Sequence, residues 1–244
     1  MTATLEEAAQ RFATELTATV QGALGQGCSP FRVQQVRSNL TVSQQPDRGL
    51  SLCCDGQPWL TLEAVYYCEW NSTRQYLRIR RSKIRLLYGE NPRPLVRYDY
   101  EPENHLRRLP AAHVQIHESA TGDMGALQYE AGDASRRARR RKQEFDRGAV
   151  PRQDDIHFPV GGDRFRPILE DVLQMLIEEY GIDREDGWER VLADSREAWR
   201  LGQIAAAAYD GPDVAARALR EQGYEVNPPA AGDPPRRQDA LRYP

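Results

Sequence analysis

The sequence predicts an α+β protein: an antiparallel meander sheet of about six strands, with an N-terminal helix and a C-terminal helical subdomain packed on one face. Three patterns lead to this fold class. Apolar residues recur at helical spacing near the N-terminus, short alternating segments separated by turns follow between residues 49 and 160, and helical spacing returns after residue 166. Regular short strands with turns between them favour an antiparallel meander.

Residues 4 to 24 form the first expected element. Thr4 can cap the N-terminus of a helix, and the apolar residues after it recur every three or four positions. These residues are Leu5, Ala9, Phe12, Leu16, Val20 and Leu24. The pattern predicts an amphipathic helix that packs on another element.

Six segments are expected to be strands. The first two, GLSLCC and WLTLEAVYYCEW, are joined by Asp55-Gly56, which is a strong hairpin signal. The others are QYLRIRRSKIRLLYGE, PLVRYDY, HVQIH and DIHFPV. In the third segment, Leu77 and Ile79 alternate out of step with Ile84. Because a two-residue period cannot change face without a break, we expect a turn or bulge at residues 81 to 83.

A basic insertion interrupts the predicted domain of residues 1 to 181. Residues 120 to 154 are polar and strongly basic in the middle, and we expect a mobile or partly helical loop there. The domain ends with a helix from residue 167 that stops at Gly181.

The remaining residues predict a small helical subdomain of residues 182 to 226. Its helices are expected from Trp188 to Tyr209 and from Pro212 to Gln222. Residues 227 to 244 are rich in proline and carry no core pattern, which predicts a disordered tail.

Bulk composition limits the classes of partner. The net charge of -3 gives no general attraction to nucleic acid or to a membrane, so any such attraction depends on local patches. The chain has no apolar run of about 18 residues, and its first residues carry acids where a secretion signal carries bases. Arginine stands in for lysine everywhere except Lys83 and Lys142, which is typical of bacteria with GC-rich genomes. We expect a bacterial, cytoplasmic protein without a membrane partner.

No motif indicates a cofactor or a metal site. The four cysteines form no C-x-x-C pair, which disfavours a zinc knuckle and a disulfide framework. A Walker motif, a dinucleotide-binding fingerprint and a serine-nucleophile elbow are also absent from the sequence. We therefore expect no cofactor and no bound metal ion.

All four histidines lie between residues 105 and 157. Sorting the last three expected strands by parity collects their apolar residues on one side, which we expect to face the helix beginning at residue 167. The opposite side then carries imidazoles, carboxylates, an amide and a guanidinium. Its members are Arg97, Asp99, His113, Gln115, His117, Asp155 and His157.

This combination of side chains suits general acid–base chemistry. An imidazole both gives and takes a proton near neutral pH, so His113 can act together with His117 or His157. A carboxylate, from Asp99 or Asp155, would orient the imidazoles. We predict these five residues as catalytic.

Cationic groups on the same face suit a phosphate. Arg97 shares the face with the histidines, and Arg164 and Arg166 lie near the start of the helix after Gly161-Gly162. A helix N-terminus also favours an anion. Cleavage of a phosphodiester by a 2′-hydroxyl needs such a cation and an acid–base pair, so RNA is an expected substrate.

Two other interpretations of the histidine face stay open. A sheet packed on one side always has a polar outer face, on which histidine is tolerated without a function. The other interpretation is metal binding by histidine with Asp99 or Asp155. His113 and His117 are about 13 Å apart on an extended strand, too far to share one ion without a bulge.

Two arginine-rich patches predict binding of nucleic acid or of an acidic partner. The first includes Arg78 and Arg80, with Tyr67, Trp70 and Tyr76 nearby as stacking candidates. The second lies in the insertion and consists of Arg136, Arg137, Arg139, Arg140 and Arg141. The alternatives are a solvated, charge-blunted edge strand and a solubilising loop. These patches also support an alternative function, a non-catalytic nucleic-acid- or protein-binding module.

Residues 95 to 181 contain, in order, VRYDYE, a histidine-bearing loop, HVQIH, DIHFP and a terminal amphipathic helix. This order resembles that of small bacterial proteins of the TumE type. The resemblance implies a toxin that acts on RNA and is held by a helix-turn-helix antitoxin or another protein partner. By position, it implies roles for Asp99, His113 and His117. The basic insertion and the long helical C-terminal region depart from that pattern.

Overall fold

The computed structural model describes the following residues: 4–36, 39–44, 49–71, 74, 76–89, 92–101, 111–116, 121–132, 134–149 and 166–238. Its helices are α1 (Leu5–Leu24), α2 (Thr121–Glu130), α3 (Arg136–Asp146), α4 (Leu169–Met175), the π-helical turn η4 (Leu176–Tyr180), α5 (Trp188–Asp210) and α6 (Pro212–Glu221). Its strands are β1 (Phe31–Val36), β2 (Asn39–Gln44), β3 (Leu50–Cys54), β4 (Gln57–Trp70), β5 (Leu77–Tyr88), β6 (Val96–Tyr100) and β7 (Ala112–Ile116). No helix in these ranges has the length and hydropathy that a membrane span requires.

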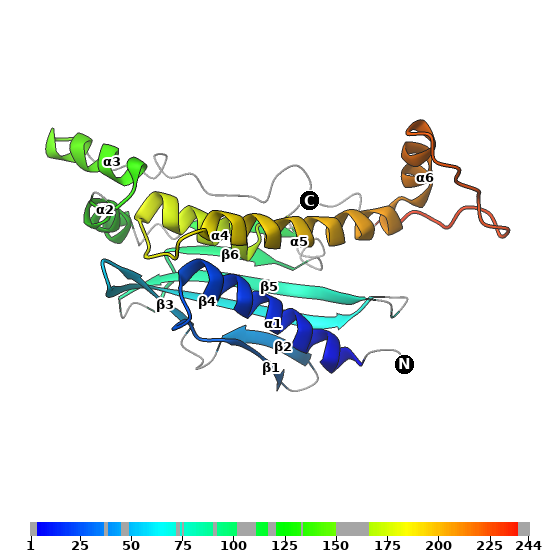
Figure 1. Cartoon of the computed structure of the whole chain (residues 1–244), viewed down its shortest axis with the longest axis horizontal. Coiled ribbons are helices and arrows are strands. Elements are labelled where there is room, and N and C mark those ends of the chain that lie inside the picture. The colour runs from blue at the N-terminus through cyan, green and yellow to red at the C-terminus, as the bar shows by residue number, and fades with distance from the viewer. Residues whose placement is uncertain are drawn as a thin grey trace.

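Seven strands form one antiparallel sheet, which confirms the predicted α+β class (Figure 1). The order is β1-β2-β4-β5-β6-β7, and β3 pairs with β4 on the same edge as β2. The β1–β2 hairpin was not predicted, because short segments such as FRVQQV carry few apolar residues to reveal an alternation. The sixth expected strand, at residues 155 to 160, lies outside the described residues.

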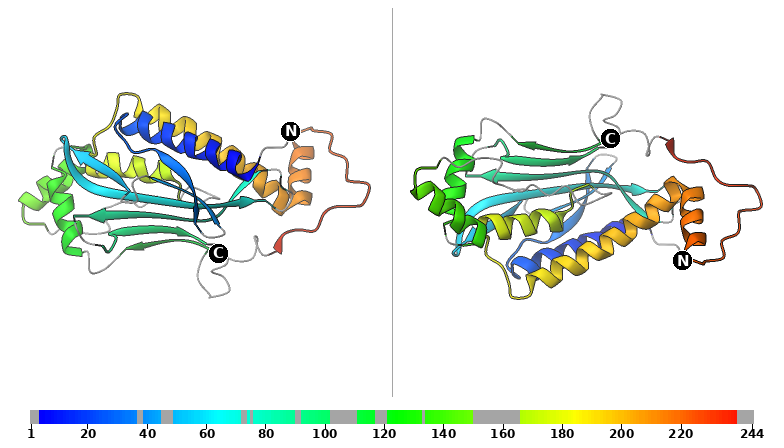
Figure 2. Two further views of the ribbon diagram at one scale, coloured as in Figure 1. Left: turned by 90° about the horizontal axis from the view of Figure 1, so that it is seen from below. Right: turned by 90° about the horizontal axis from the view of Figure 1, so that it is seen from above.

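A capping box starts α1 where the sequence predicts it. The backbone N–H of Glu7 donates to Thr4 Oγ1 over 3.2 Å, and the N–H of Thr4 donates to Glu7 Oε2 over 2.7 Å. Ala9 and Ala13 are fully buried, and their small side chains let the helix lie close to its neighbours. Figure 2 shows α1 alongside α5, on the same side of the sheet as α4. This side of the sheet therefore holds the hydrophobic core.

β5 contains the predicted bulge, one residue earlier than expected. Tyr67 pairs with Arg81 but Cys68 pairs with Ile79, so Arg80 is the extra residue. The bulge restores the alternation, because Ile79 and Ile84 are both buried on the helix-covered side. The strand is otherwise continuous and pairs with β4 over most of its length.

The basic insertion consists largely of two helices. α2 and α3 pack against each other at the end of the sheet, with the polar α3 capped by Ser135, whose Oγ accepts from the N–H of Ala138 over 3.0 Å. Glu130 of α2 accepts hydrogen bonds from Trp59 Nε1 (2.8 Å) and from the hydroxyl of Tyr88 (3.1 Å). The described part of the insertion is thus attached to the sheet through specific contacts.

The helix expected from residue 167 begins at Leu169, with Ile168 at its N-cap. Its last turn widens into η4 and ends at Gly181, as predicted, with the left-handed backbone angle φ of +71°. The residues from Leu169 to Tyr180 are almost all buried against the sheet.

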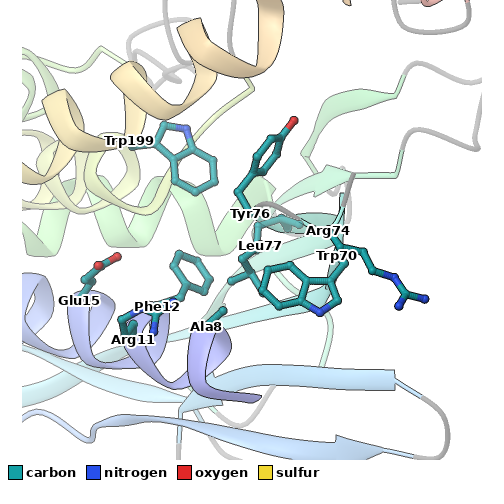
Figure 3. Close-up of a pocket in the computed structure, with 10 residues that line it drawn as sticks. Ala8, Arg11, Phe12, Glu15, Trp70, Arg74, Tyr76, Leu77 and Trp199 are labelled. Atoms are coloured by element: carbon teal, nitrogen blue, oxygen red, sulfur yellow. The ribbon is translucent and has the colours of Figure 1, made fainter. Parts of the chain in front are cut away.

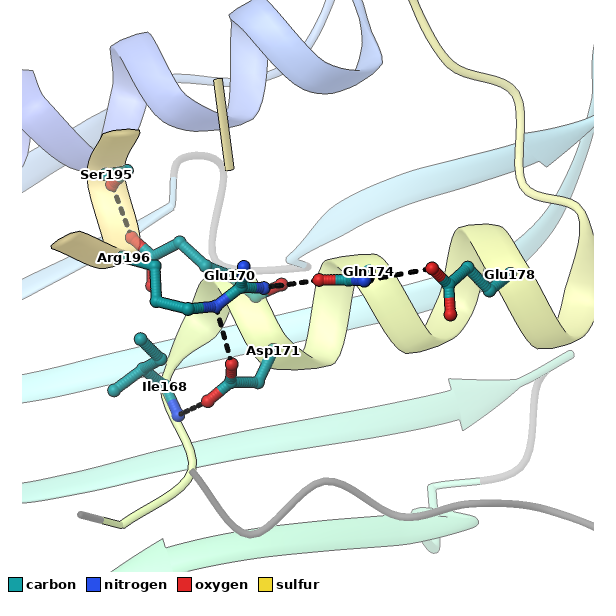
Figure 4. Close-up of polar contacts among 7 residues, drawn as sticks. All are labelled: Ile168, Glu170, Asp171, Gln174, Glu178, Ser195 and Arg196. Atoms are coloured by element: carbon teal, nitrogen blue, oxygen red, sulfur yellow. Dashed lines mark hydrogen bonds and ion pairs between the residues drawn. The ribbon is translucent and has the colours of Figure 1, made fainter. Parts of the chain in front are cut away.

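Polar groups of α4 and α5 meet where these helices pack together (Figure 4), and α1 adds one hydroxyl group. The hydroxyl of Ser195 donates to Glu170 Oε1 over 2.6 Å and lies 2.8 Å from the hydroxyl of Thr19. Arg196 Nε donates to Asp171 Oδ1 over 2.9 Å. Burial raises the pKa of Glu170 above its ordinary value of 4.5. The network therefore joins α5 to α4, although burial of the Glu170 carboxyl group disfavours its charged form.

α5 runs along the sheet to its end, where the rings of Tyr209 and Tyr76 lie 5.9 Å apart, and α6 follows beyond that end (Figures 1 and 2). Both helices lie close to the predicted bounds. Leu201, Ile204 and Tyr209 are each at least half exposed, and α6 has no buried residue. We refer to α6 together with α5 from Leu201 onward as the helical arm.

Within the expected disordered tail, the structure places Arg236 and Arg237 against the helical arm. Arg236 forms an ion pair with Asp213, and Arg237 lies 3.5 Å from the carboxylate of Asp210. The backbone N–H of Arg237 also donates to the carbonyl oxygen of Asp210 over 3.0 Å. Electrostatic contacts hold this stretch, which is why a search for apolar residues does not detect them.

Candidate functional site

The strand register brings the predicted polar face together on β5, β6 and β7. His113 of β7 lies directly opposite Asp99 of β6, and Asp99 lies opposite Lys83 of β5. Arg97 is paired in the same way with Gln115. Val96 and Tyr98, which alternate with these residues, are buried on the helix-covered side. The parity argument is therefore confirmed for the described residues. We call Lys83, Arg97, Asp99, His113 and Gln115 the sheet-face cluster.

Asp99 is the centre of the sheet-face cluster. Its Oδ2 lies 2.9 Å from Arg97 Nε and 3.8 Å from His113 Nε2, the latter distance being an ionic contact when the imidazole is protonated. Arg97 also donates a hydrogen bond to Gln115 Oε1. The side chains of Asp99 and His113 are only 11% and 18% exposed, so solvent screens their interaction weakly.

One carboxylate oxygen of Asp99 can still accept a hydrogen bond. Its Oδ1 is buried, and within the described part of the chain it has no hydrogen-bond partner. A buried carboxylate oxygen without a donor is costly, so a donor that reaches it is favoured. Rotation of the His113 ring or the arrival of a hydroxyl group would supply one.

The sequence analysis did not assign Lys83 to this face. Partial burial, followed by the nearby charge of Arg81, lowers the pKa of Lys83. The predicted break at residues 81 to 83 left its parity undetermined, whereas the bulge at Arg80 fixes it. Alternation counted onward from the bulge at Arg80 would have placed Lys83 on the face of the sheet-face cluster.

These groups together can perform three operations on a substrate. The imidazole of His113 can move a proton, and the carboxylate of Asp99 can orient the ring and stabilise its protonated form. The ammonium of Lys83 and the remaining N–H groups of Arg97 can hold an anionic oxygen. This is the functional repertoire of a general acid–base site for a phosphate ester.

Several predicted residues lie outside the described part of the chain. They are His117, Asp155, His157 and Arg164. Among the residues that the structure describes, no group of three histidine, cysteine or acidic side chains has the arrangement of a metal site. The roles assigned to the four residues remain predictions from the sequence.

Arg166 was predicted to hold phosphate near a helix start, and its surroundings are different. Its guanidinium lies 3.9 Å from the ring centre of Tyr100 and 5.0 Å from that of Trp199. Burial lowers the pKa of Arg166. It is therefore a partly buried, ring-stacked cation on the helix-covered side, away from the sheet-face cluster, because Tyr100 has the opposite parity to Asp99.

The first arginine-rich patch is largely matched by acids. On β5, Arg78 lies 3.4 Å from Glu69, and Arg85 forms an ion pair with Glu63. Both acids are cross-strand neighbours on β4. Arg80, the bulged residue, is exposed. The patch therefore presents a smaller net positive charge than the arginine count indicates.

The second patch divides into two faces of α3. Arg136, Arg139 and Arg140 are exposed, with Arg140 lying 3.7 Å from Glu144. The side chain of Arg137 is outside the described part. Arg141 was predicted to bind nucleic acid, but it is 5% exposed and forms a buried ion pair with Glu179 of η4. It attaches α3 to the core, so its assignment to a binding surface is wrong.

The three aromatic residues predicted to stack on bases, Tyr67, Trp70 and Tyr76, lie on opposite faces of the sheet. Tyr67 lies on the same face as the sheet-face cluster, with the guanidinium of Arg81 5.0 Å from its ring centre. Trp70 and Tyr76 instead line a cavity at the end of the sheet, together with Trp199.

Comparisons of the chain with protein-family models, with curated proteins and with solved structures find no match. The resemblance to TumE-type proteins thus remains a prediction from the sequence.

Proposed function

We propose that the protein cleaves RNA, using the sheet-face cluster as an acid–base site and the 2′-hydroxyl of the substrate as nucleophile. The observation that carries the proposal is the direct cross-strand pairing of His113 with Asp99, whose carboxylate also lies 2.9 Å from Arg97. A proton carrier, an orienting carboxylate and a cation are three of the components that this reaction requires, and a second acid is the fourth.

In the proposed reaction, the imidazole of His113 takes the proton of a 2′-hydroxyl while the 2′-oxygen attacks the adjacent phosphorus. The bond between phosphorus and the 5′-oxygen breaks, leaving a 2′,3′-cyclic phosphate. The leaving 5′-oxygen takes a proton from a second acid, for which His117 and His157 are the predicted candidates. Asp99 stabilises the imidazolium that forms.

The phosphate gains negative charge on its non-bridging oxygens in this transition state. Lys83 lies opposite Asp99 on β5, Arg97 lies two residues before Asp99 on β6, and both supply cations for that charge. Preorganised cations of this kind act most strongly in a site with little solvent. No step of this reaction uses a metal ion or a cofactor.

The toxin role forms part of the proposal and rests on the resemblance to TumE-type proteins. A toxin that cleaves RNA would be held by a protein partner, such as a helix-turn-helix antitoxin. A gene for a small DNA-binding regulator beside the gene for this protein would support that role.

The proposal is tested by incubating the purified protein with end-labelled RNA and with DNA of the same sequence in the presence of a chelator. We expect cleavage of RNA alone and products that end in a 2′,3′-cyclic phosphate. His113→Ala should abolish cleavage without lowering the melting temperature.

Ser43→Ala provides the matched control. Ser43, Val65, Lys83 and Asp99 are successive cross-strand neighbours. Ser43 therefore lies on the same face as His113, but it is three strands away from Asp99, on the side opposite His113. This variant should keep full activity. Cleavage by folded His113→Ala at the rate of the unaltered protein would refute the catalytic role.

A second candidate function is a non-catalytic nucleic-acid- or protein-binding module. The exposed apolar residues of the helical arm favour it, because Leu201 and Ile204 are 59% and 53% exposed. This function predicts no RNA cleavage and a loss of binding to a candidate partner when Leu201 and Ile204 are both replaced by serine. Cleavage that depends on His113 would decide against it as the primary function.

A further inference from the structure

A cavity on the helix-covered side of the sheet has the form of a ligand site. It lies between α1, α5 and the turn that joins β4 to β5, and its volume is about 570 Å³. Figure 3 shows Phe12, Trp70, Tyr76 and Trp199 around it, contributed by four different segments. Small-molecule sites have volumes of roughly 300–1,000 Å³ and mostly apolar or aromatic walls. The cavity meets both conditions.

The charged groups of the cavity favour an anion. Arg11 and Glu15 line it from α1, and Arg74 lines it from the turn, which leaves a net positive charge. Arg166 does not line the cavity, but its guanidinium lies 5.0 Å from the ring centre of Trp199, which does. The described part of the chain offers Arg166 two aromatic rings and no carboxylate partner. Its charge therefore adds to the positive potential at the cavity.

In the turn at the mouth of the cavity, the backbone of Arg74 is strained. Arg74 has a φ of +55°, a left-handed angle that is uncommon for residues other than glycine. Asn71 holds this turn, because its carbonyl oxygen accepts from the N–H of Arg74 (3.0 Å) and its Oδ1 accepts from the N–H of Tyr76 (3.1 Å). The strain is maintained at the position that places one cation and one aromatic ring at the cavity.

We infer that this cavity binds a nucleotide, with the base stacked on the aromatic side chains and the phosphate held by Arg11 or Arg74. Planar bases stack on tryptophan and tyrosine regardless of sequence, and the planar guanidinium matches a phosphate group. The inference does not rest on RNA cleavage, since the cavity and the sheet-face cluster lie on opposite sides of the sheet. A free nucleotide and one residue of single-stranded RNA present the same chemistry.

Titration calorimetry with AMP and UMP tests the inference. We expect both to bind, and adenosine and ribose 5-phosphate to bind at least about tenfold more weakly, since each lacks one of the two recognised groups. A tetranucleotide of adenosine that binds more tightly than AMP would identify single-stranded RNA as the source, and the reverse order would identify the free nucleotide. Equal affinities for AMP and adenosine, or no binding of any nucleotide, would overturn the inference.

Substitutions of exposed arginines locate the ligand. Arg74→Gln and Arg11→Gln together should weaken AMP binding by about tenfold or more, because two charge-assisted contacts are lost. Arg190→Gln is the matched control, since Arg190 lies on α5 outside the cavity with 89% of its side chain exposed. An unchanged Kd in the double variant would refute the site. His113→Ala should leave AMP binding intact, so failure of the proposed function is distinguishable from failure of this one.

Discussion

Cross-strand neighbours determine which single residues act together in this protein. Asp99 and His113 are far apart in the chain but opposite one another in the sheet, as are Glu63 and Arg85. Exposed ion pairs such as the one between Glu63 and Arg85 contribute little to stability, about 0–1 kcal/mol. Their main effect is to neutralise a patch that the sequence presents as basic, and this leaves Lys83 and Arg97 as the cations beside the only described histidine.

Parity predicts the described part of the candidate site because the period of a strand is two. Arg97, Asp99, His113 and Gln115 were all assigned to the correct face in this way. The environments of Arg141 and Arg166 were not predictable from sequence, because each depends on a partner far away in the chain. Glu179 pairs with the first, and the ring of Trp199 covers the second.

The buried carboxyl of Glu170 predicts a specific pH dependence of stability. Burial raises its pKa in the folded state, so the folded protein keeps a proton there that the unfolded chain loses above about 4.5. Below about pH 4.5, the protonated Glu170 makes its full contribution to the free energy of unfolding. That contribution is lost as the pH rises through the folded-state pKa.

Glu170→Gln removes this titration while keeping an oxygen that can accept from Ser195. We expect the variant to melt at a higher temperature than the unaltered protein at pH 7, with the difference disappearing near pH 4. Thermal unfolding followed by circular dichroism across this range measures it. A variant that is less stable at pH 7 would show that the ionised carboxylate stabilises the fold.

Helices and strands were predicted best where their end signals are strong. Thr4 and Gly181 mark their helix ends in both the sequence and the structure. α4 begins at Leu169 rather than at residue 167, and the β1–β2 hairpin was not predicted. Neither feature has a strong local signal in the sequence. The insertion was the hardest element to predict, since the polar α3 is held by a buried ion pair and by packing on α2, and its sequence shows no apolar face.

The ion pair between Arg141 and Glu179 is expected to dominate the attachment of α3 to η4. Arg141→Leu would leave the carboxylate of Glu179 buried without its partner, at a cost of about 3–5 kcal/mol in the free energy of unfolding. The double change to leucine at both positions should recover most of that loss. Urea unfolding of the three proteins measures both values, and equal stability of the single and double variants would contradict the buried pair.

Gly181 is the position where a side chain is least tolerated. Its φ is +71°, and a Cβ atom there would lie 2.0 Å from the Cβ of Ala134. Gly181→Ala should lower the free energy of unfolding by about 2 kcal/mol or more, from backbone strain and from the separation of the two segments. Gly187→Ala is the control, because its φ is also positive but no atom lies within 4 Å of the added Cβ. Equal losses in the two variants would show that the close approach to Ala134 has no effect.

On the scale of the whole molecule, the sheet separates two chemically different surfaces. One carries the sheet-face cluster, and the other carries the helices, the core and the aromatic cavity. The α+β class was predictable because both periods, helical and strand-like, are clear in the sequence. The sequence also predicts that the C-terminal helices pack on one face of the sheet, but it does not predict that α5 packs on α1, with Trp188 and Leu192 in the common core.

The helical arm should contribute little to the stability of this core. Removing residues 212 to 244 deletes α6, which has no buried residue. We expect the melting temperature to change by less than about 3 °C, which corresponds to roughly 1 kcal/mol for a chain of this size. Calorimetric melting of the shortened chain measures it, and a decrease of 10 °C or more would indicate that the arm is integral to the fold.

The most direct test of the acid–base site is the single-turnover cleavage rate of a DNA oligonucleotide that contains one ribonucleotide. The proposed mechanism predicts cleavage only on the 3′ side of that ribonucleotide. It also predicts a rate at least about a hundredfold lower for His113→Gln, since this is the usual contribution of a general base. Cleavage at the deoxyribonucleotides, or an equal rate in folded His113→Gln, would contradict it.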